Sequence, residues 1–357
     1  MAKITLSNIG HSYNQDKDQS TWALKPIDMV WESGKTYALL GPSGCGKTTI
    51  LNTISGLVTP YQGRLFFDDQ DVTNVPTAQR NIAQVFQFPT IYRSMSVYEN
   101  LSFPLVCRGW KADKIKARVH EIAEILEITE KLGRSAVKLG ADEKQLISLG
   151  RGLVRNDVSA LLMDEPLTVI DPQSKFELRK KIKAINKINN LTVIYVTHDQ
   201  YEAMTFADEL LVMSFGEVIQ RGTPEQLFEK PNSKYVGNFI GSPAMNFLPV
   251  ESTSGEINFG STKLKTQAAS GALKGKTLEV GIRPEYVLLA SGSGANVIQA
   301  ELLGHEDLGS VRVLKCVSGG TPISVKIPRS QGLPTGKQLS LSLPSEKLWV
   351  YQDGRLA

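Results

Sequence analysis

Short apolar and β-branched runs recur through the first two thirds of the chain, and helical patterns separate several of them. The runs lie at Val30 and at residues 37–40, 82–86, 160–163, 192–196 and 210–213. Residues 111–129 and 173–188 are helical stretches, and the charged segment 111–130 has an apolar stripe that predicts an amphipathic surface helix. Strands that alternate with helices predict an α/β fold, with a largely parallel sheet covered by helices.

The pattern changes after residues 241–243. Short strand candidates then dominate, at residues 256–259, 277–282, 287–289, 311–317, 323–327 and 338–343, with Gly, Pro and Ser between them. This texture predicts a small all-β, barrel-like domain. We therefore expect two domains, an α/β domain over residues 1–240 and a β-domain over residues 241–357.

Length and composition are typical of a soluble globular protein. The chain has 357 residues, of which 41% are hydrophobic and 21% charged, and its formal net charge is +4. This charge is too small to indicate nucleic acid binding. Cys45, Cys107 and Cys316 are scattered without metal or disulfide spacing, which favours a reducing cytosol. We expect no signal peptide and no membrane span, so a membrane role would need a partner.

One glycine-rich segment has the spacing of a phosphate-binding loop. Gly41, Gly46, Lys47 and Thr48 fill the pattern G-x-x-x-x-G-K-[ST], between a strand-like run and a helical stretch. Such a loop points backbone N–H groups at a polyphosphate, while the lysine reaches the β- and γ-phosphates and the hydroxyl binds Mg²⁺. We expect the whole loop to bind nucleotide: Gly41, Pro42, Ser43, Gly44, Cys45, Gly46, Lys47, Thr48 and Thr49.

Two carboxylates and a histidine follow later strands. Asp164 and Glu165 end an apolar run, where Asp164 would face Mg²⁺ and Glu165 would direct a water at the γ-phosphate. Solvated acids are common at strand ends, but a phosphate-binding loop upstream favours catalysis. His198 follows the run 192–196 and could bind both the γ-phosphate and the carboxylate that activates the water. A lone histidine is more often structural, but its place after a second strand favours the catalytic interpretation.

Two further residues are candidates for the nucleotide site. Gln87 follows the run 82–86, and its amide could reach Mg²⁺ or the attacking water. Tyr13 could stack on adenine through its ring face, and a core or surface tyrosine is the alternative interpretation.

In this order, Tyr13, the loop, Gln87, Asp164-Glu165, Asp171 and His198 resemble the ATPase subunit of an ATP-binding cassette transporter. Residues 239–247, FIGSPAMNF, and 281–285, GIRPE, resemble its sugar-importer branch, the maltose and glycerol-phosphate type. The resemblance implies that a small β-barrel regulatory domain of OB type follows the ATPase.

The resemblance also implies cofactors and partners. It implies ATP and Mg²⁺, catalytic roles for Gln87, Glu165 and His198, and metal contacts from Thr48, Gln87 and Asp164. It places the chain peripherally on the cytoplasmic face of the bacterial inner (plasma) membrane, with transmembrane permease subunits contacted by residues 88–97. A periplasmic or extracellular solute-binding protein would be an indirect partner, and no nucleic acid is implied.

The segment that resembles the family's signature motif, usually LSGGQ, departs from it. Leu139 is kept, whereas Gly140, Ala141, Asp142 and Glu143 replace the serine, both glycines and the glutamine. The segment loses a hydroxyl and gains two acids facing a polyphosphate, although acids also favour a helix N-terminus. Residues 168–171, TVID, depart from the loop that crosses the family's dimer interface, but Asp171 is kept.

Family members dimerise head to tail, so each signature motif serves the partner's nucleotide. We therefore expect a heterodimer in which this chain supplies the working ATP site and a second ATPase supplies an intact signature. The predicted function is to power import of a sugar, a polyol, glycerol or glycerol phosphate. Glycerol is our first expectation, because glycerol importers of this branch pair two distinct ATPases.

Two alternatives stay open. The chain could be a non-catalytic, ATP-sensing regulatory subunit of the same kind of transporter. It could also be a soluble ATPase that acts on nucleic acid or ribosomes, which predicts basic tracts or coiled-coil insertions that this sequence lacks.

Overall fold

The chain divides into two compact units, residues 1–224 and 225–357. The computed structural model describes residues 2–14, 18–155, 158–253, 256–267, 277–292 and 294–357. Helix α7 (Pro224–Glu229) starts at the division, and α8 (Lys234–Phe239) belongs to the second unit. The division therefore lies before the expected domain boundary after residue 240, which stays a prediction.

A six-stranded sheet forms the centre of the first unit, in the order β10-β9-β3-β8-β7-β6. Its bounds are β3 (Thr36–Leu40), β6 (Ile82–Val85), β7 (Ala160–Asp164), β8 (Val193–Thr197), β9 (Glu209–Ser214) and β10 (Glu217–Gly222). All neighbours are parallel except the β9–β10 hairpin, which confirms the largely parallel sheet.

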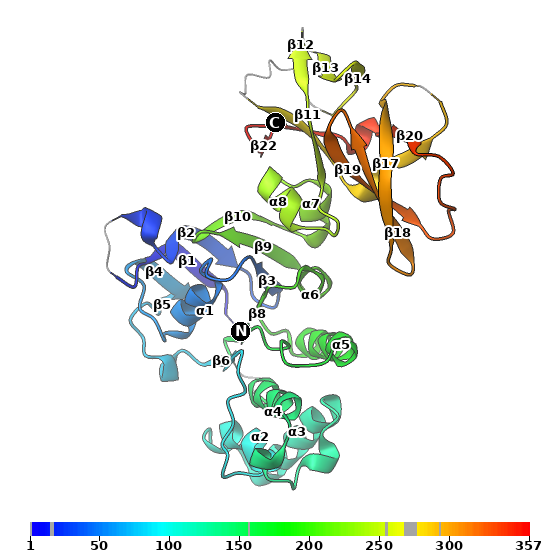
Figure 1. Cartoon of the computed structure of the whole chain (residues 1–357). Coiled ribbons are helices and arrows are strands. Elements are labelled where there is room, and N and C mark those ends of the chain that lie inside the picture. Colours follow the sequence, from blue (N-terminus) through cyan, green and yellow to red (C-terminus); the bar gives the residue numbers. More distant parts are fainter. Residues whose placement is uncertain (1, 15–17, 156–157, 254–255, 268–276, 293) are drawn as a thin grey trace. The chain divides into compact units, whose positions relative to one another are not determined.

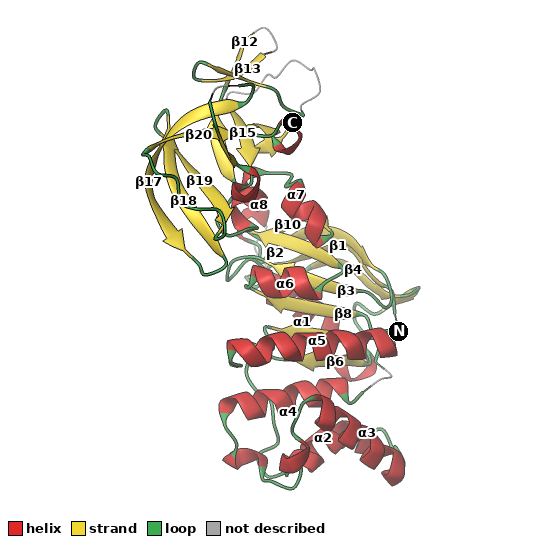
Figure 2. Ribbon diagram, turned by 90° about the vertical axis from the view of Figure 1, so that its right-hand side faces the viewer, coloured by secondary structure: helices red, strands yellow, loops and turns green. Residues whose placement is uncertain are grey.

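Helices cover both faces of this sheet. They are α1 (Lys47–Ser55), α2 (Val97–Val106), α3 (Ala112–Ile125), α4 (Ala141–Leu153), α5 (Pro172–Asn189) and α6 (Gln200–Phe206). Helix α1 packs into one apolar cluster and α5 into another, while α2, α3 and α4 gather beyond β6 (Figure 1; Figure 2). Successive strand residues alternate between the clusters: Leu161 lies in one and Leu162 in the other. Burial on both faces explains the continuous apolar runs in the sequence.

A second, antiparallel sheet in the first unit was not predicted. Its order is β2-β1-β4-β5, with β1 (Ile4–His11), β2 (Leu24–Trp31), β4 (Gln62–Phe67) and β5 (Gln70–Asp71). Among its strands, β4 and β5 keep exposed positions, so their apolar signal is weak. Among the described helices, none combines the length and apolar composition needed to cross a bilayer.

The second unit is built mainly of antiparallel strands around one apolar cluster. Its largest sheet has the order β16-β20-β17-β18-β19, with β16 (Leu288–Ala290), β17 (Val297–Asp307), β18 (Val311–Ser318), β19 (Thr321–Pro328) and β20 (Gln338–Ser342). A second sheet has the order β11-β15-β21-β22, with β11 (Asn246–Pro249), β15 (Leu278–Ile282), β21 (Trp349–Gln352) and β22 (Arg355–Leu356). A third has the order β12-β13-β14, with β12 (Glu251–Thr253), β13 (Glu256–Phe259) and β14 (Thr262–Leu264). The all-β expectation is confirmed, although the long strand β17 was missed because its second half is largely exposed.

Candidate nucleotide-binding site

The phosphate-binding loop joins β3 to α1, and backbone packing requires two of its glycines. Gly46 is the N-cap of α1 at φ 103°, and a Cβ there would lie 2.4 Å from the Ala23 carbonyl oxygen. A Cβ on Gly41 would lie 2.5 Å from the Met213 carbonyl oxygen. Gly44 is also left-handed, at φ 78°, and the position that a Cβ would take there is open. The loop can therefore bring bare backbone close to a ligand.

Lys47 is held by its own loop. Its Nζ donates hydrogen bonds to the carbonyl oxygens of Gly41 at 2.8 Å and Pro42 at 2.9 Å, and the side chain is buried. The Cys45 sulfur lies 3.8 Å from the same Nζ, and burial raises the pKa of that thiol, so it stays protonated. The Lys47 ammonium group is therefore held beside the loop by backbone carbonyl groups.

Thr48 and Asp164 bring two side-chain oxygens together beside the loop. The Thr48 hydroxyl lies 3.0 Å from Asp164 Oδ2 at the end of β7. Burial raises the pKa of Asp164, and the neighbouring Glu165 charge adds to this. A buried carboxylate beside a hydroxyl suits Mg²⁺, a hard cation that binds oxygen. Among the described residues, no cluster of three His, Cys, Asp or Glu side chains could hold a metal by itself.

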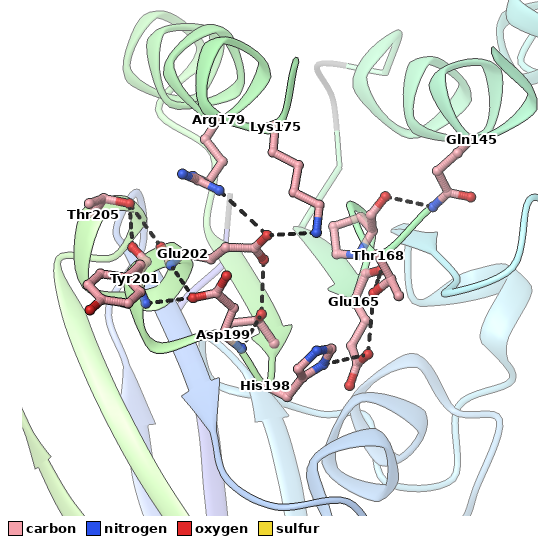
Figure 3. Close-up of polar contacts among 12 residues, drawn as sticks. Gln145, Glu165, Thr168, Lys175, Arg179, His198, Asp199, Tyr201, Glu202 and Thr205 are labelled. Carbon is pink, nitrogen blue, oxygen red and sulfur yellow. Dashed lines mark hydrogen bonds and ion pairs between the residues drawn. The ribbon is translucent and has the colours of Figure 1, made fainter. Parts of the chain in front are cut away.

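Glu165 is the meeting point of three segments. Its Oε2 lies 3.0 Å from His198 Nδ1 and 3.4 Å from the Thr168 hydroxyl (Figure 3). The same Oε2 lies 3.3 Å from Gln87 Nε2. Gln87, Glu165 and His198 follow the adjacent parallel strands β6, β7 and β8, whose carboxyl ends share one edge. The backbone of Glu165 is left-handed, at φ 46°, which is strained for a residue with a side chain.

These residues line one pocket of about 580 Å³. Its lining comprises Tyr13, Ala23, Ser43, Gly44, Gly46, Lys47, Thr48, Thr49, Gln87, Glu165, Thr168 and His198. The structure thus brings together the residues expected to bind nucleotide, with Gly41, Pro42, Cys45 and Asp164 around the same loop. Ala23 and Thr168 were not predicted, and the sequence gives no signal for Ala23.

Tyr13 lies at the rim of this pocket. Its side chain is 61% exposed, and its hydroxyl lies 3.2 Å from the Thr49 hydroxyl. The His11 ring meets the Tyr13 ring edge-on, with 4.5 Å between their centroids. The tyrosine ring is thus a supported, exposed apolar surface, which suits stacking on a base.

The segment 139–143 lies at the start of α4, with Gly140 as N-cap and Leu139 buried in the core. Glu143 turns back: its Oε2 accepts the Gly140 N–H at 2.8 Å, and its Oε1 pairs with Lys131. These contacts, Lys131 foremost, lower the pKa of Glu143. The expectation that both acids face a polyphosphate is therefore corrected for Glu143, whose charge is paired within the chain.

Asp142 differs from Glu143. It is exposed, and its Oδ1 lies 2.7 Å from the point where a Cβ on Gly140 would stand. A carboxylate thus fills the space in which a serine side chain would begin. Ala141 beside it is exposed as well.

Asp171 does not line the nucleotide pocket. It is the N-cap of α5, where its Oδ1 accepts the Ser174 N–H at 3.0 Å. With Asp142 it lines a separate pocket of about 380 Å³ along α5.

Gln145 of α4 was missed by sequence reasoning. Its Nε2 donates a hydrogen bond to the Pro166 carbonyl oxygen at 2.8 Å (Figure 3) and another to the Phe86 carbonyl oxygen at 3.2 Å. Gln145 therefore links the segments that carry Gln87 and Glu165. A polar residue on the buried face of a helix was the available signal.

Comparison with known families matches both units. The family model described as "ABC transporter" matches residues 24–168, and the one described as "MalK OB fold domain" matches residues 241–287. The expected fold class, a phosphate-loop ATPase domain followed by an OB-type β-domain, is confirmed.

Solved structures share the fold of the first unit. The cbiO1 protein of the Clostridium perfringens ABC transporter complex cbiONQ aligns with a TM-score of 0.57 at 27% identity, covering 64% of this chain and 90% of its own. The ATP-binding cassette MJ0796, solved as a dimer with ADP and Pi, aligns with a TM-score of 0.56 at 23% identity, covering 62% of this chain and 98% of its own. The second likeness concerns the fold alone.

Curated relatives match over nearly the full length. The chain is 33% identical to the uncharacterized ABC transporter ATP-binding protein YurJ of Bacillus subtilis, over 98% of each chain. It is 37% identical to the sn-glycerol-3-phosphate import ATP-binding protein UgpC of a Ruegeria species, over 98% of this chain and 97% of the relative. It is 35% identical to the trehalose/maltose import ATP-binding protein MalK of Thermococcus litoralis, over 92% and 93%. With this identity sustained across both units, the chain belongs to the family of ABC transporter ATP-binding proteins, which are ATPases coupled to transport.

Proposed function

We propose that this chain is the ATP-hydrolysing subunit of an importer for a sugar, a polyol, glycerol or glycerol phosphate. The observation that carries the catalytic part is the contact of Glu165 with His198 and Gln87 above the phosphate-binding loop. Relatives with printed import functions act on sn-glycerol 3-phosphate and on trehalose and maltose, which supports this solute class.

The chain's residues divide the work of hydrolysis. Loop N–H groups and Lys47 would bind the phosphates, with Tyr13 on the adenine face. Glu165 would orient a water for in-line attack and take its proton, while His198 and Gln87 hold the carboxylate in place. Thr48, Asp164 and Gln87 would hold Mg²⁺, which when bound neutralises charge on the phosphate oxygens.

An asymmetric pair of ATPases is the second part of the proposal. In a head-to-tail dimer, segment 139–143 would face the partner's nucleotide. A transition state rich in negative charge needs hydrogen-bond donors there. Gly140 offers no hydroxyl, and the Asp142 carboxylate occupies its place. The partner would therefore carry an intact signature, and this chain's loop would form the working site.

Permease subunits are the proposed membrane partners. Residues 88–97 follow Gln87 and expose aromatic surface, with Phe88 74% and Tyr92 39% exposed. Aromatic residues are enriched at protein interfaces. The chain would be a peripheral subunit on the cytoplasmic face of the bacterial inner (plasma) membrane, and a solute-binding protein would act on the transporter indirectly.

Reconstitution of the complete transporter tests this function. Vesicles containing the permease, both ATPases and the binding protein would be supplied with labelled glycerol, sn-glycerol 3-phosphate or maltose. ATP-dependent uptake of one solute, with matching stimulation of ATP hydrolysis, is the expected result. Uptake of none of these classes would reject the solute proposal.

A single-turnover assay separates the enzyme from the regulatory alternative. The complex would receive labelled ATP at less than one equivalent per site. The proposal expects release of phosphate that Glu165→Gln abolishes. A sensor would bind ATP without hydrolysing it at this site, and Glu165→Gln would change nothing.

A further inference from the structure

Glu202 is a buried acid in α6, four positions after His198 in the chain, and the hydrolysis scheme gives it no role. It is 4% exposed. Its Oε2 accepts hydrogen bonds from the Tyr195 hydroxyl at 2.8 Å and the Thr197 hydroxyl at 2.9 Å. Its Oε1 lies 3.6 Å from Lys175 Nζ and 3.5 Å from Arg179 Nη1, both on α5 (Figure 3). One carboxylate thus joins β8, α6 and α5.

The contacts of Glu202 reach the residues on both sides of His198 in the chain. Thr197 Oγ1 donates to Glu202 and accepts the Asp199 N–H at 3.0 Å. The Asp199 carboxylate in turn caps α6 through the Tyr201 N–H at 2.8 Å. The residues on both sides of His198 are therefore fixed to Glu202, directly or through one hydroxyl. The His198 side chain is 60% exposed, so packing does little to fix its ring.

A carboxylate at position 202 is unfavourable by itself, because the side chain is buried. Burying a carboxylate costs on the order of several kcal/mol unless ion pairs and hydrogen bonds compensate for the lost hydration. Here two cations and two hydroxyls do so, and burial together with Glu202 raises the pKa of Tyr195 well above its ordinary value, which keeps its hydroxyl a donor. Well-packed apolar residues often replace buried ion pairs without loss of stability. Directional contacts to β8 and α5 are what an apolar residue could not supply.

We propose that Glu202 is a positioning residue for His198. It anchors the 197–199 turn to α5, whose N-cap is Asp171, and so holds His198 against Glu165. The inference rests on the proposed catalytic role of Glu165 and His198. Because Glu202 does not line the nucleotide pocket, its effect falls on turnover and leaves nucleotide binding intact.

The test is Glu202→Gln in the complete transporter. Glutamine keeps the shape and an oxygen for the two hydroxyls, but it cannot pair with Lys175 and Arg179. We expect kcat to fall about 10- to 100-fold, with KM for ATP and the Kd of MgATP within about twofold of wild type, since small displacements of catalytic groups have effects of this size. Lys180→Met is the matched control, because Lys180 lies on α5 but pairs with exposed Glu177, and its kcat should be unchanged.

A second variant tests the same link from the other side. Lys175→Met with Arg179→Met keeps the two hydroxyl bonds and should lower kcat in the same way. Combined with Glu202→Gln it should add little, because the residues act as one unit. Full additivity would overturn the proposal, and so would an unchanged kcat in Glu202→Gln.

Two further measurements keep the test decisive. If Glu202→Gln does not fold, Thr197→Val removes one anchor of the turn, and a retained kcat there would overturn the proposal. His198→Ala separates the two hypotheses: an active His198→Ala enzyme refutes the proposed catalytic role itself. A dead His198→Ala enzyme beside a fully active Glu202→Gln enzyme refutes the positioning role alone.

Discussion

His198 Nδ1 lies 3.0 Å from Glu165 Oε2, although 33 positions separate the two residues in the chain. Their strands, β7 and β8, are parallel neighbours, so both side chains emerge at one edge. Glu165→Gln in this chain is therefore expected to lower ATP hydrolysis by the assembled transporter about 100-fold or more, as loss of a general base does. Steady-state phosphate release measures this.

The proposed asymmetry is tested by making the same change in the proposed partner ATPase. The corresponding Glu→Gln change in the partner should reduce turnover by less than about twofold, because a weak second site contributes only a minor share of it. Equal losses from the two changes, or a larger loss from the partner's, would contradict an asymmetric pair.

Asp142 and Glu143 should respond differently to substitution. Gly140→Ser with Asp142→Gly restores a hydroxyl and removes the exposed carboxylate, so ATP hydrolysis by this chain alone should rise about tenfold or more. Glu143→Gln should give no such gain, because Glu143 already pairs with Lys131 and caps Gly140. Hydrolysis at a fixed high protein concentration, where the homodimer forms, checks both. A gain from Glu143→Gln alone would show that the wrong acid had been identified.

Tyr13 should contribute to affinity through its ring. Tyr13→Ala is expected to raise the Kd of ATP about 3- to 10-fold, the usual worth of one aromatic contact. Tyr13→Phe keeps the ring and loses only the contact with the Thr49 hydroxyl, so its Kd should stay within about twofold. Titration with a fluorescent ATP analogue distinguishes the two, and equal effects would argue against stacking.

Asp164 should reduce the stability of the nucleotide-free chain at neutral pH. Burial raises its pKa above the ordinary 3.8, so the folded chain binds that proton more tightly than the unfolded chain does. Stability is then lost as pH rises from 3.8 to the raised pKa, and the loss is complete above it. Asp164→Asn lacks this dependence and keeps an oxygen for Thr48.

We therefore expect Asp164→Asn to unfold at a higher temperature than wild type in EDTA at neutral pH, and the gap to close as pH falls toward 4, where the ordinary pKa lies. Added MgATP should raise the Tm of wild type and have little effect on the variant. Differential scanning calorimetry measures both, and a gap that widens in acid would refute this account.

Arg283 should hold the second unit together. It is almost fully buried and donates to the carbonyl oxygens of Phe228, Gly237 and Ile240. Arg283→Met leaves these three carbonyl oxygens without their hydrogen-bond donor, so the free energy of unfolding of this unit should fall by on the order of 3 kcal/mol. Amide hydrogen exchange of β15 and β21 in the full chain measures this loss of stability. Unchanged protection would contradict a stabilising role for Arg283.

The sequence predicted most where burial was complete. Residues of β3, β7 and β8 are apolar on both faces, and the loop at Gly41 needs fixed residue types, so the sheet and the pocket could be read in advance. The orientation of the Glu143 side chain could not be predicted, because it depends on an ion pair with Lys131, twelve positions earlier. For Gln145 the sequence offered only a polar residue on the buried face of a helix, and the partners of Gln145 and Glu202 could not be read because they include residues of distant segments.

The left-handed backbone of Glu165 costs stability on the order of 1 kcal/mol that glycine would not pay. Selection for a durable fold alone would thus favour replacing this residue. A chain released from hydrolysis would gain stability by replacing this glutamate. That the strained residue is still a glutamate therefore favours a chain whose own ATP site remains in use.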